Sequence, residues 1–230
     1  MSIYVTGDTH GDMNRFSFER WPESRNLTEN DVMIIAGDFG LIWDNVPSNH
    51  EKYWRQWLTT KKWTFAFVEG NHENHPRLAD LPKVPMFGST VGVVEKNIIH
   101  LKRGEIYEIQ GKKIFTFGGA DSVDKGMRRL GISWWPEELP TNDQIEYALN
   151  NLERYQYAVD IIIAHTAPQD IADIFFKKYG TLAYNPDPTR KFLQHICSET
   201  EFDEFYCGHW HEEYENGKYH FLNENIIKIV

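Results

Sequence analysis

The sequence predicts an α/β fold in which two β-sheets pack together and helices cover their outer faces. Three observations support this prediction. Short runs rich in β-branched and aromatic residues recur along the chain, helical patterns with capping signals separate several of them, and a central stretch has no helical period. The 230 residues contain no repeat, low-complexity tract or linker, so we expect a single domain over residues 1–230.

Five apolar runs predict strands that are buried on both faces, because each run is nearly continuous over the length of a strand. They span residues 3–5, 31–36, 65–68, 159–164 and 202–207. Each run ends in small or polar residues, and we therefore expect the chemistry of the chain at strand ends.

Four helices are predicted between or after these strands. Ser48-x-x-Glu51 and Thr141-x-x-Gln144 both fit the capping-box pattern, and apolar residues follow each of them at helical spacing. Residues 169–178 and 189–197 indicate two shorter helices. Apolar stripes of this kind predict helix faces that pack on the sheets.

The middle and the end of the chain predict further strands. Residues 91–120 read as strand, turn, strand, with Gly104 and Gly111 at turns. Residues 219–223 and 226–230 predict a closing hairpin.

The composition argues against several classes of protein. Thirty-four acidic side chains outnumber 24 Lys and Arg, and the net charge of −10 disfavours stable nucleic-acid binding. The longest apolar runs fall far short of the roughly 20 residues that cross a bilayer, so no membrane association is expected. The N-terminus reads as a strand with no cleavable leader. Cys197 and Cys207 lack CxxC spacing and favour a reducing cytoplasm.

Carboxylate, amide and imidazole side chains collect at the ends of five predicted strands. In chain order they are Asp8, His10, Asp38, Asn71, His72, His165, His209 and His211. Ligands gather at the carboxyl ends of strands in open α/β sheets, and Asp-x-His or His-x-His places alternate side chains on one side. Oxygen and imidazole donors without thiolate suit Mn²⁺, Fe²⁺ or Zn²⁺. Their number exceeds the need of one ion, which favours two ions that share a carboxylate.

These residues lie in five blocks that resemble the motifs of the calcineurin-like metallophosphoesterase superfamily. In order, the blocks are Gly7-Asp8-x-His10-Gly11, Gly37-Asp38, Gly70-Asn71-His72-Glu73, Ala164-His165 and Gly208-His209-x-His211. The resemblance spans residues 7–211. It implies a four-layer α/β/β/α fold, a two-sheet β-sandwich flanked by helices.

The resemblance also implies a role for each matching residue. One ion would be held by Asp8, His10, Asp38 and His211, and the second by Asp38, Asn71, His165 and His209, with Asp38 bridging. Mn²⁺ is the favoured ion, and Fe or Zn are alternatives. His72 would protonate the leaving group as general acid. Glu73 would either orient His72 or be an exposed structural carboxylate.

The activity implied is hydrolysis of a small phosphomonoester or phosphodiester, with nucleotides among the candidate substrates. Residues 199–215 carry seven acidic side chains and no Lys or Arg around the last motif. Such an acidic rim should favour small substrates over long polyanions.

Two alternatives are a Ser/Thr-type protein phosphatase and a non-catalytic metal-binding scaffold of the same fold. The phosphatase branch has Asp-Arg-Gly after its second motif, which is absent here, and an arginine where this chain has Glu69. Every ligand position is filled, which argues against a scaffold. An acidic residue that often pairs with the catalytic histidine in the family is replaced by Leu41, and Asp44 is either a stand-in or a solvated loop carboxylate.

An insert over residues 118–136 is rich in basic and aromatic side chains. It predicts a substrate wall that clamps a phosphate or stacks on a base. The alternative is a surface loop whose tryptophans pack on the helix near Asn142. The predicted substrate-binding residues are Asp121, Arg128, Arg129 and Trp134.

Overall fold

A computed structural model describes residues 1–179 and 187–230, and within them it contains two sheets with helices on both sides. The first sheet has the strand order β13-β1-β2-β3-β6-β5-β4. Its strands are β1 (Ile3–Thr6), β2 (Val32–Ile35), β3 (Thr64–Phe67), β4 (Lys83–Met86), β5 (Ser89–Glu95), β6 (Ile98–Leu101) and β13 (Ile227–Lys228). Strands β1, β2 and β3 are parallel, with Val5 opposite Ile34 and Ile34 opposite Ala66, so their carboxyl ends share one edge.

The second sheet has the strand order β11-β12-β10-β9-β8-β7. Its strands are β7 (Ile106–Ile109), β8 (Lys112–Phe117), β9 (Ile161–Ala164), β10 (Glu204–Cys207), β11 (Tyr214–Asn216) and β12 (Tyr219–Phe221). Strands β8, β9, β10 and β12 are mutually parallel neighbours. The predicted central strands are therefore divided between the sheets, since β5 and β6 belong to the first and β7 and β8 to the second.

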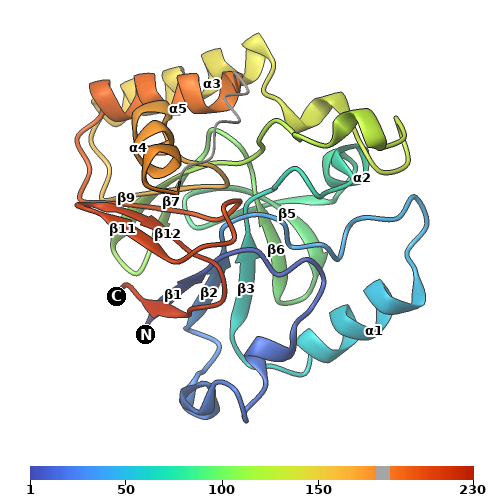
Figure 1. Cartoon of the computed structure of the whole chain (residues 1–230). Coiled ribbons are helices and arrows are strands. Elements are labelled where there is room, and N and C mark those ends of the chain that lie inside the picture. The colour runs from blue at the N-terminus through green and yellow to red at the C-terminus, as the bar shows by residue number, and fades with distance from the viewer. Residues whose placement is uncertain (180–186) are drawn as a thin grey trace.

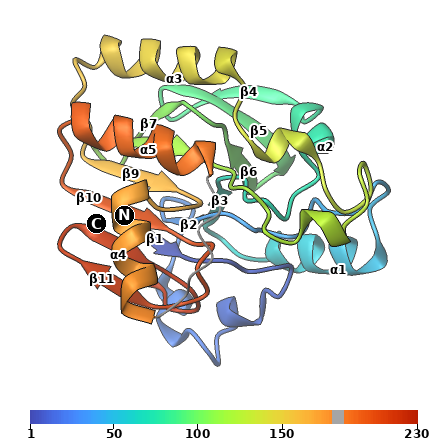
Figure 2. The ribbon, with the colours of Figure 1, turned by 45° about the horizontal axis from the view of Figure 1, so that its top comes forward.

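The helices cover the outer faces of the two sheets. Helix α1 (Asn49–Leu58) lies on the side of the first sheet, whereas α3 (Asn142–Arg154), α4 (Gln169–Tyr179) and α5 (Pro188–Glu199) cover the second (Figures 1 and 2). The short helix α2 (His75–Ala79) follows β3. The predicted four-layer α/β/β/α order is confirmed.

Three apolar clusters correspond to the three spaces between these layers. Ile34 of β2 and Ile163 of β9 pack together between the sheets. Phe65 of β3 packs outward with Leu58 of α1, and Phe117 of β8 packs outward with Leu193 of α5. The strands are thus buried on both faces, as their continuous apolar runs predict.

The two predicted capping boxes differ in outcome. At α3, Thr141 accepts a hydrogen bond from the amide of Gln144, whose side chain accepts one from the Thr141 amide. At α1, Ser48 accepts from the amide of Glu51, but the Glu51 carboxylate instead accepts from backbone amides of the preceding loop. The position of Glu51 is therefore decided by tertiary contacts as well as by the helix start.

The predicted closing hairpin is wrong. Strand β12 pairs antiparallel with β11, while β13 leaves that sheet and pairs antiparallel with β1 of the other sheet. The chain between Phe221 and Ile227 thus crosses from one sheet to the other. The first sheet thereby acquires an edge strand that covers β1. Pairing of β13 with β1 takes the place of the local hairpin between β12 and β13.

Candidate metal centre and active site

The side chains of the five motif blocks meet where strands of both sheets end. Asp8 and His10 follow β1, Asp38 follows β2, and Asn71 and His72 follow β3 of the first sheet. From the second sheet, His165 follows β9, and His209 and His211 follow β10.

None of the described helices is long and apolar enough to span a membrane.

One group of donors surrounds the imidazole of His10. Its Nε2 lies 3.0 Å from Nε2 of His211 and 3.7 Å from Oδ2 of Asp38. Nε2 of His211 is also 3.6 Å from Oδ2 of Asp8. Burial lowers the pKa of His10 to about 4, which leaves the imidazole neutral and its lone pair available to a metal. The donor atoms of Asp8, His10 and His211 all lie within 4.8 Å of one another.

A second group of donors surrounds the carboxamide of Asn71. Its Oδ1 lies 2.9 Å from Nε2 of His165 and 3.1 Å from Nδ1 of His209. Nε2 of His165 is 3.4 Å from Oδ1 of Asp38. Asp38 therefore borders both groups, as a bridging carboxylate must. The donor atoms of Asp8, Asp38 and His165 also lie within 4.8 Å of one another.

Hydrogen bonds with the backbone fix the orientation of these side chains. The amide of His209 donates to both carboxylate oxygens of Asp8, at 3.0 and 2.7 Å. Nδ1 of His165 lies 3.0 Å from the carbonyl of Ala36, which can only accept, so Nδ1 carries the proton and Nε2 is left as a donor atom for a metal. The amide of His72 donates to Oδ1 of Asp38 at 2.8 Å.

The backbone itself is strained at this edge. His10, Asp38, His209 and His211 have positive φ angles of 44°, 47°, 71° and 52°. A left-handed conformation is unfavourable for residues with a Cβ and accumulates at functional sites. Glycines provide the space that the carboxylates need, since a Cβ at Gly70 would overlap the Asp38 carboxylate.

Burial and neighbouring charge shift the two central carboxyl groups in opposite directions. Burial raises the pKa of Asp8 to about 7. Burial also acts to raise the pKa of Asp38, but His165, His72 and His10 outweigh it and bring the value to about 2. Two carboxylates buried this close to several imidazoles suit a centre that cations neutralise. The residues present therefore fit divalent ions with oxygen and nitrogen ligands.

His72 lies beside the metal-ligand groups and contacts the insert. Its Nε2 is 2.8 Å from Nη2 of Arg128, and its ring stacks on Trp43 with centroids 5.6 Å apart. A guanidinium group only donates, so Nε2 of His72 accepts this hydrogen bond. Burial lowers the pKa of His72, and Arg128 adds to this effect while Asp38 opposes it. His10, Asp38 and His72 also form a third group whose donor atoms lie within 4.8 Å of one another.

Glu73 is fully buried, so the expectation of an exposed carboxylate is wrong. Its carboxylate accepts from the amides of Gly40 at 2.9 Å and Gly70 at 2.5 Å, and it thereby joins the loops after β2 and β3. Burial raises its pKa well above the usual range, with Asp38 adding to this effect. Among the described residues, no hydrogen bond joins the side chain of Glu73 or Asp44 to the ring of His72.

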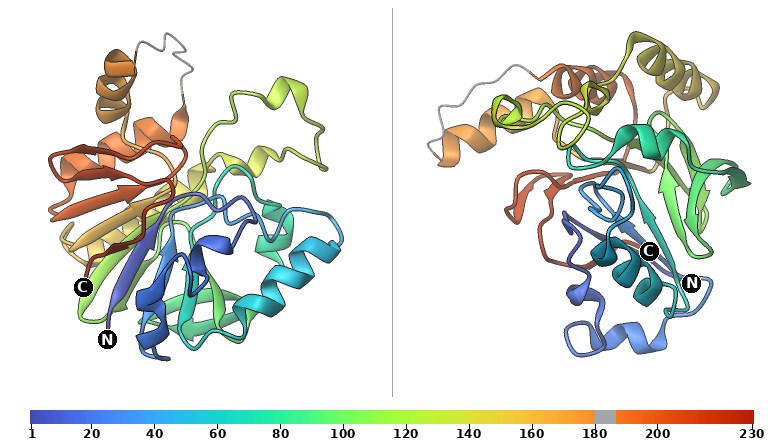
Figure 3. Two further views of the ribbon diagram at one scale, coloured as in Figure 1. Left: turned by 60° about the horizontal axis from the view of Figure 1, so that its bottom comes forward. Right: turned by 90° about the vertical axis from the view of Figure 1, so that its right-hand side faces the viewer.

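The loop between β8 and α3 extends beyond the sheets (Figure 3), and the four predicted substrate-binding residues belong to this segment of the chain. Within the described part of the chain, Arg128 is the one of the four whose side chain has a hydrogen bond to a motif side chain. Asp121 is buried and pairs with Lys125 at 2.6 Å. Nε1 of Trp134 donates to Glu138 at 2.9 Å, and the side chain of Arg129 is exposed. The insert is a largely exposed surface loop, with Val123 77% and Met127 86% exposed, and through Arg128 it also reaches the ring of His72.

Ser122 and Glu138 contact the candidate site, but neither belongs to a motif that the sequence shows. Nδ2 of Asn71 donates to Oγ of Ser122 at 3.1 Å, and Ser122 donates to Glu138 at 2.6 Å. This chain of hydrogen bonds connects a ligand candidate to the insert. Ser122 directly follows Gly118-Gly119-Ala120-Asp121 at the end of a predicted strand, which is the only hint of its role.

Glu69 precedes the third motif and points away from the metal-ligand groups. Its carboxylate lies 3.0 Å from Nε of Arg103 and 2.8 Å from Nε2 of His100 in the buried interior. This residue therefore belongs to a structural ion network.

Comparison with known proteins identifies the family. The model of the calcineurin-like phosphoesterase family matches residues 1–213. No curated protein matches the chain. A matching solved structure from Staphylococcus aureus, described as a "putative 5'-nucleotidase" in complex with alpha-ketoglutarate, has a TM-score of 0.49 and 12% identity, and covers 99% of this chain. The chain spans 50% of the length of that structure. Because the family model covers nearly all of its length, the chain belongs to the calcineurin-like phosphoesterase family.

Proposed function

We propose that the chain is a dinuclear enzyme that hydrolyses small phosphomonoesters or phosphodiesters. The observation that carries this proposal is the convergence of all the motif side chains at one edge of both sheets. The proposed ligands are Asp8, His10, Asp38 and His211 for one ion and Asp38, Asn71, His165 and His209 for the other. Mn²⁺ is the favoured ion, with Fe or Zn as alternatives. Bound divalent ions would supply an activated water and neutralise the phosphoryl oxygens.

Arg128 is proposed to bind the phosphate, and His72 is proposed to protonate the leaving group. Phosphoryl oxygens accept hydrogen bonds from guanidinium more strongly than an imidazole nitrogen does. An arriving phosphate would therefore draw Arg128 away from Nε2 of His72. That nitrogen can then hold a proton and deliver it to the leaving oxygen as general acid. Asp121, Arg129 and Trp134 are proposed as further contacts of the insert with the substrate.

Substrate size follows from the charge around the centre. The acidic run over residues 199–215 repels long polyanions at many points, whereas a small ester interacts mainly with the centre itself. Nucleotides are candidate substrates on this ground.

Neither alternative function gains support. The Ser/Thr phosphatase branch has an arginine at the position of Glu69. In this chain the Glu69 carboxylate instead pairs with Arg103 in the interior. A non-catalytic scaffold would not be expected to retain both groups of donors together with His72.

The reducing cytoplasm is our proposed location. Cys197 and Cys207 are free thiols, and Cys207 is buried. Burial raises the pKa of the Cys197 thiol to about 12, so it stays protonated and unreactive.

The test is a panel of metals against substrates. Protein loaded with Mn²⁺, Fe²⁺ or Zn²⁺ is assayed on p-nitrophenyl phosphate, its bis-ester and a set of nucleotides, and its metal content is measured. We expect about two ions per chain, and His72→Gln should lower kcat by about 10² to 10⁴-fold. Arg128→Gln should raise KM, while Arg154→Gln at an exposed position on α3 is the control.

Several outcomes would contradict the proposal. No turnover of any ester by loaded protein, or turnover that His72→Gln leaves unchanged, would refute the catalytic assignment. Fewer than one ion per chain after loading would refute the dinuclear centre. Release of phosphate from phosphoserine peptides with poor diester turnover would instead revive the protein phosphatase.

A further inference from the structure

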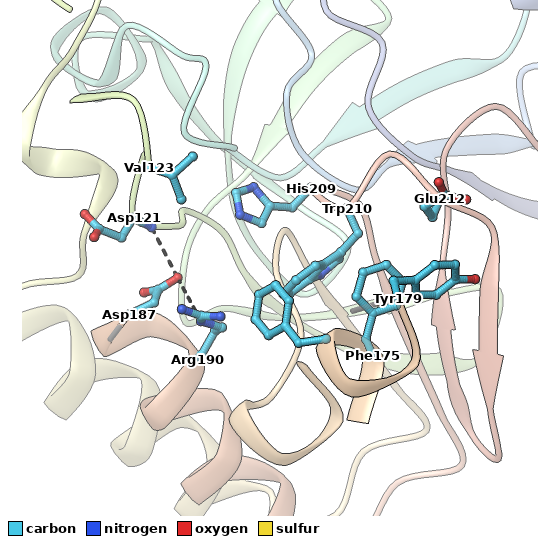
Figure 4. A pocket seen from close by; sticks show the side chains of 10 residues that line it. Asp121, Val123, Phe175, Tyr179, Asp187, Arg190, His209, Trp210 and Glu212 are labelled. Carbon is cyan, nitrogen blue, oxygen red and sulfur yellow. Dashed lines mark hydrogen bonds and ion pairs between the residues drawn. The ribbon is translucent and has the colours of Figure 1, made fainter. Parts of the chain in front are cut away.

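A cavity of about 450 Å³ lies directly beside the candidate metal centre (Figure 4). His209 forms part of its wall, and Nδ1 of the same residue lies 3.1 Å from Oδ1 of Asn71. A phosphate bound at the centre would therefore place one of its substituents at the mouth of this cavity. The volume falls within the range of roughly 300 to 1,000 Å³ that is typical of small-molecule sites.

Aromatic side chains dominate one wall of the cavity. Phe175, Phe176 and Tyr179 come from α4, and Trp210 follows β10. The ring centroids of Phe176 and Trp210 are 5.2 Å apart, and Trp210 stacks on Phe221 at 5.3 Å, which fixes its position. Tyr179 is 46% exposed. A fixed aromatic wall of this kind binds flat rings by stacking.

Charged side chains on the lining disfavour a second anion. Among the described lining residues, the carboxylates of Asp121, Asp187 and Glu212 outnumber the single guanidinium, of Arg190. Asp121 is also paired with Lys125 outside the lining, which leaves the net charge around the cavity negative. Nε of Arg190 lies 3.7 Å from Asp187, and the guanidinium lies 5.7 Å from the centroid of the Phe176 ring, so its charge is already engaged. An additional phosphate or carboxylate would meet net negative charge, whereas ring N–H groups would find acceptors.

We propose that this cavity binds the organic group of the ester and selects a flat, uncharged heteroaromatic ring that carries N–H donors. A nucleobase of a nucleoside monophosphate has this chemistry, and a sugar phosphate or a polyphosphate chain does not. The inference rests on the proposed function, because it assumes that the phosphate binds at the metal centre.

The test compares two substrates that differ only in the base. For metal-loaded protein, kcat/KM is measured on adenosine 5′-monophosphate and on ribose 5-phosphate. We expect at least a tenfold preference for the nucleotide, and Phe176→Ala and Tyr179→Ala should each lower that ratio by about five- to tenfold, as expected for one lost stacking contact. Phe18→Ala and Tyr53→Ala replace exposed residues of the same types outside the cavity and should leave the ratio unchanged.

A binding measurement separates this proposal from the proposed function. Adenosine, which has no phosphate, is titrated into the loaded protein by calorimetry, with ribose as the control. Binding of adenosine that Tyr179→Ala weakens about fivefold or more supports the cavity assignment, even if no ester is hydrolysed. Equal kcat/KM for the two phosphates, or adenosine binding that neither variant weakens, would overturn it while leaving the hydrolase activity intact.

Discussion

His75 makes the fold sensitive to acid through a single buried imidazole. It is 8% exposed at the start of α2, and burial lowers its pKa to about 3, with Arg103 adding to this effect and Glu69 opposing it. In the unfolded chain the group returns to a pKa of about 6.5. Protonation therefore favours unfolding, and the stability that His75 contributes is complete above pH 6.5 and falls as the pH decreases toward 3.

The magnitude depends mainly on the unfolded chain. Between pH 7.5 and pH 5, uptake of a proton by unfolded His75 costs the native state about 2 kcal/mol. The folded pKa lies below this range, so a shift of one unit in its value changes the result little. Other buried histidines, including His10 with a pKa lowered to about 4, also lower the free energy of unfolding at acid pH. These contributions are the same in all the variants compared and cancel in the difference.

Urea unfolding in EDTA at pH 7.5 and pH 5 measures this effect. His75→Gln removes the titrating group, so its free energy of unfolding should fall by about 2 kcal/mol less than that of the wild type over this range. The same substitution at His195, which is exposed on α5, controls for the chemical change. An equal decline in wild type and His75→Gln would refute the assignment of a buried neutral imidazole.

Three further substitutions test other parts of the structure. Arg77→Met removes the two-point partner of Glu51, which is 1% exposed, and should lower the free energy of unfolding by about 3 kcal/mol in urea titrations. Ser122→Ala frees the carboxamide of Asn71 and should weaken binding of one of two ions by about 10 to 100-fold in metal titrations, with Ser122→Thr retaining affinity. Gly70→Ala should lower metal content and activity together, because the added methyl overlaps the carboxylate of Asp38, the proposed bridging ligand, and normal metal content would contradict this contact.

Local patterns in the sequence are sufficient to predict the layers of the fold. Continuous apolar runs identified β1, β2, β3, β9 and β10, since a strand buried on both faces tolerates few polar residues. Parallel strands bring their carboxyl ends to one edge, and the polar residues that end each run could therefore be expected to meet.

Partners that depend on tertiary packing could not be read from the sequence. Glu73 lies next to His72 in the chain, yet its carboxylate turns inward to the amide of Gly40. The insert offers adjacent arginines, and only the path of the loop decides that Arg128 meets His72. The pairing of β13 with β1 of the other sheet also depends on tertiary packing. The local sequence pattern does not show that β1 has an edge that another strand can cover.

The division of the ligands between two sheets has a consequence for folding. Each proposed ion would cross-link segments far apart in the chain, since His10 and His211 are separated by 201 positions. A cross-link of this length removes much conformational freedom from the unfolded chain. Each ion at 100 times its dissociation constant would add about 2.7 kcal/mol to the stability of the native state. Removing the ions should therefore weaken the association of the two sheets before it weakens either sheet, and amide exchange would reveal this order.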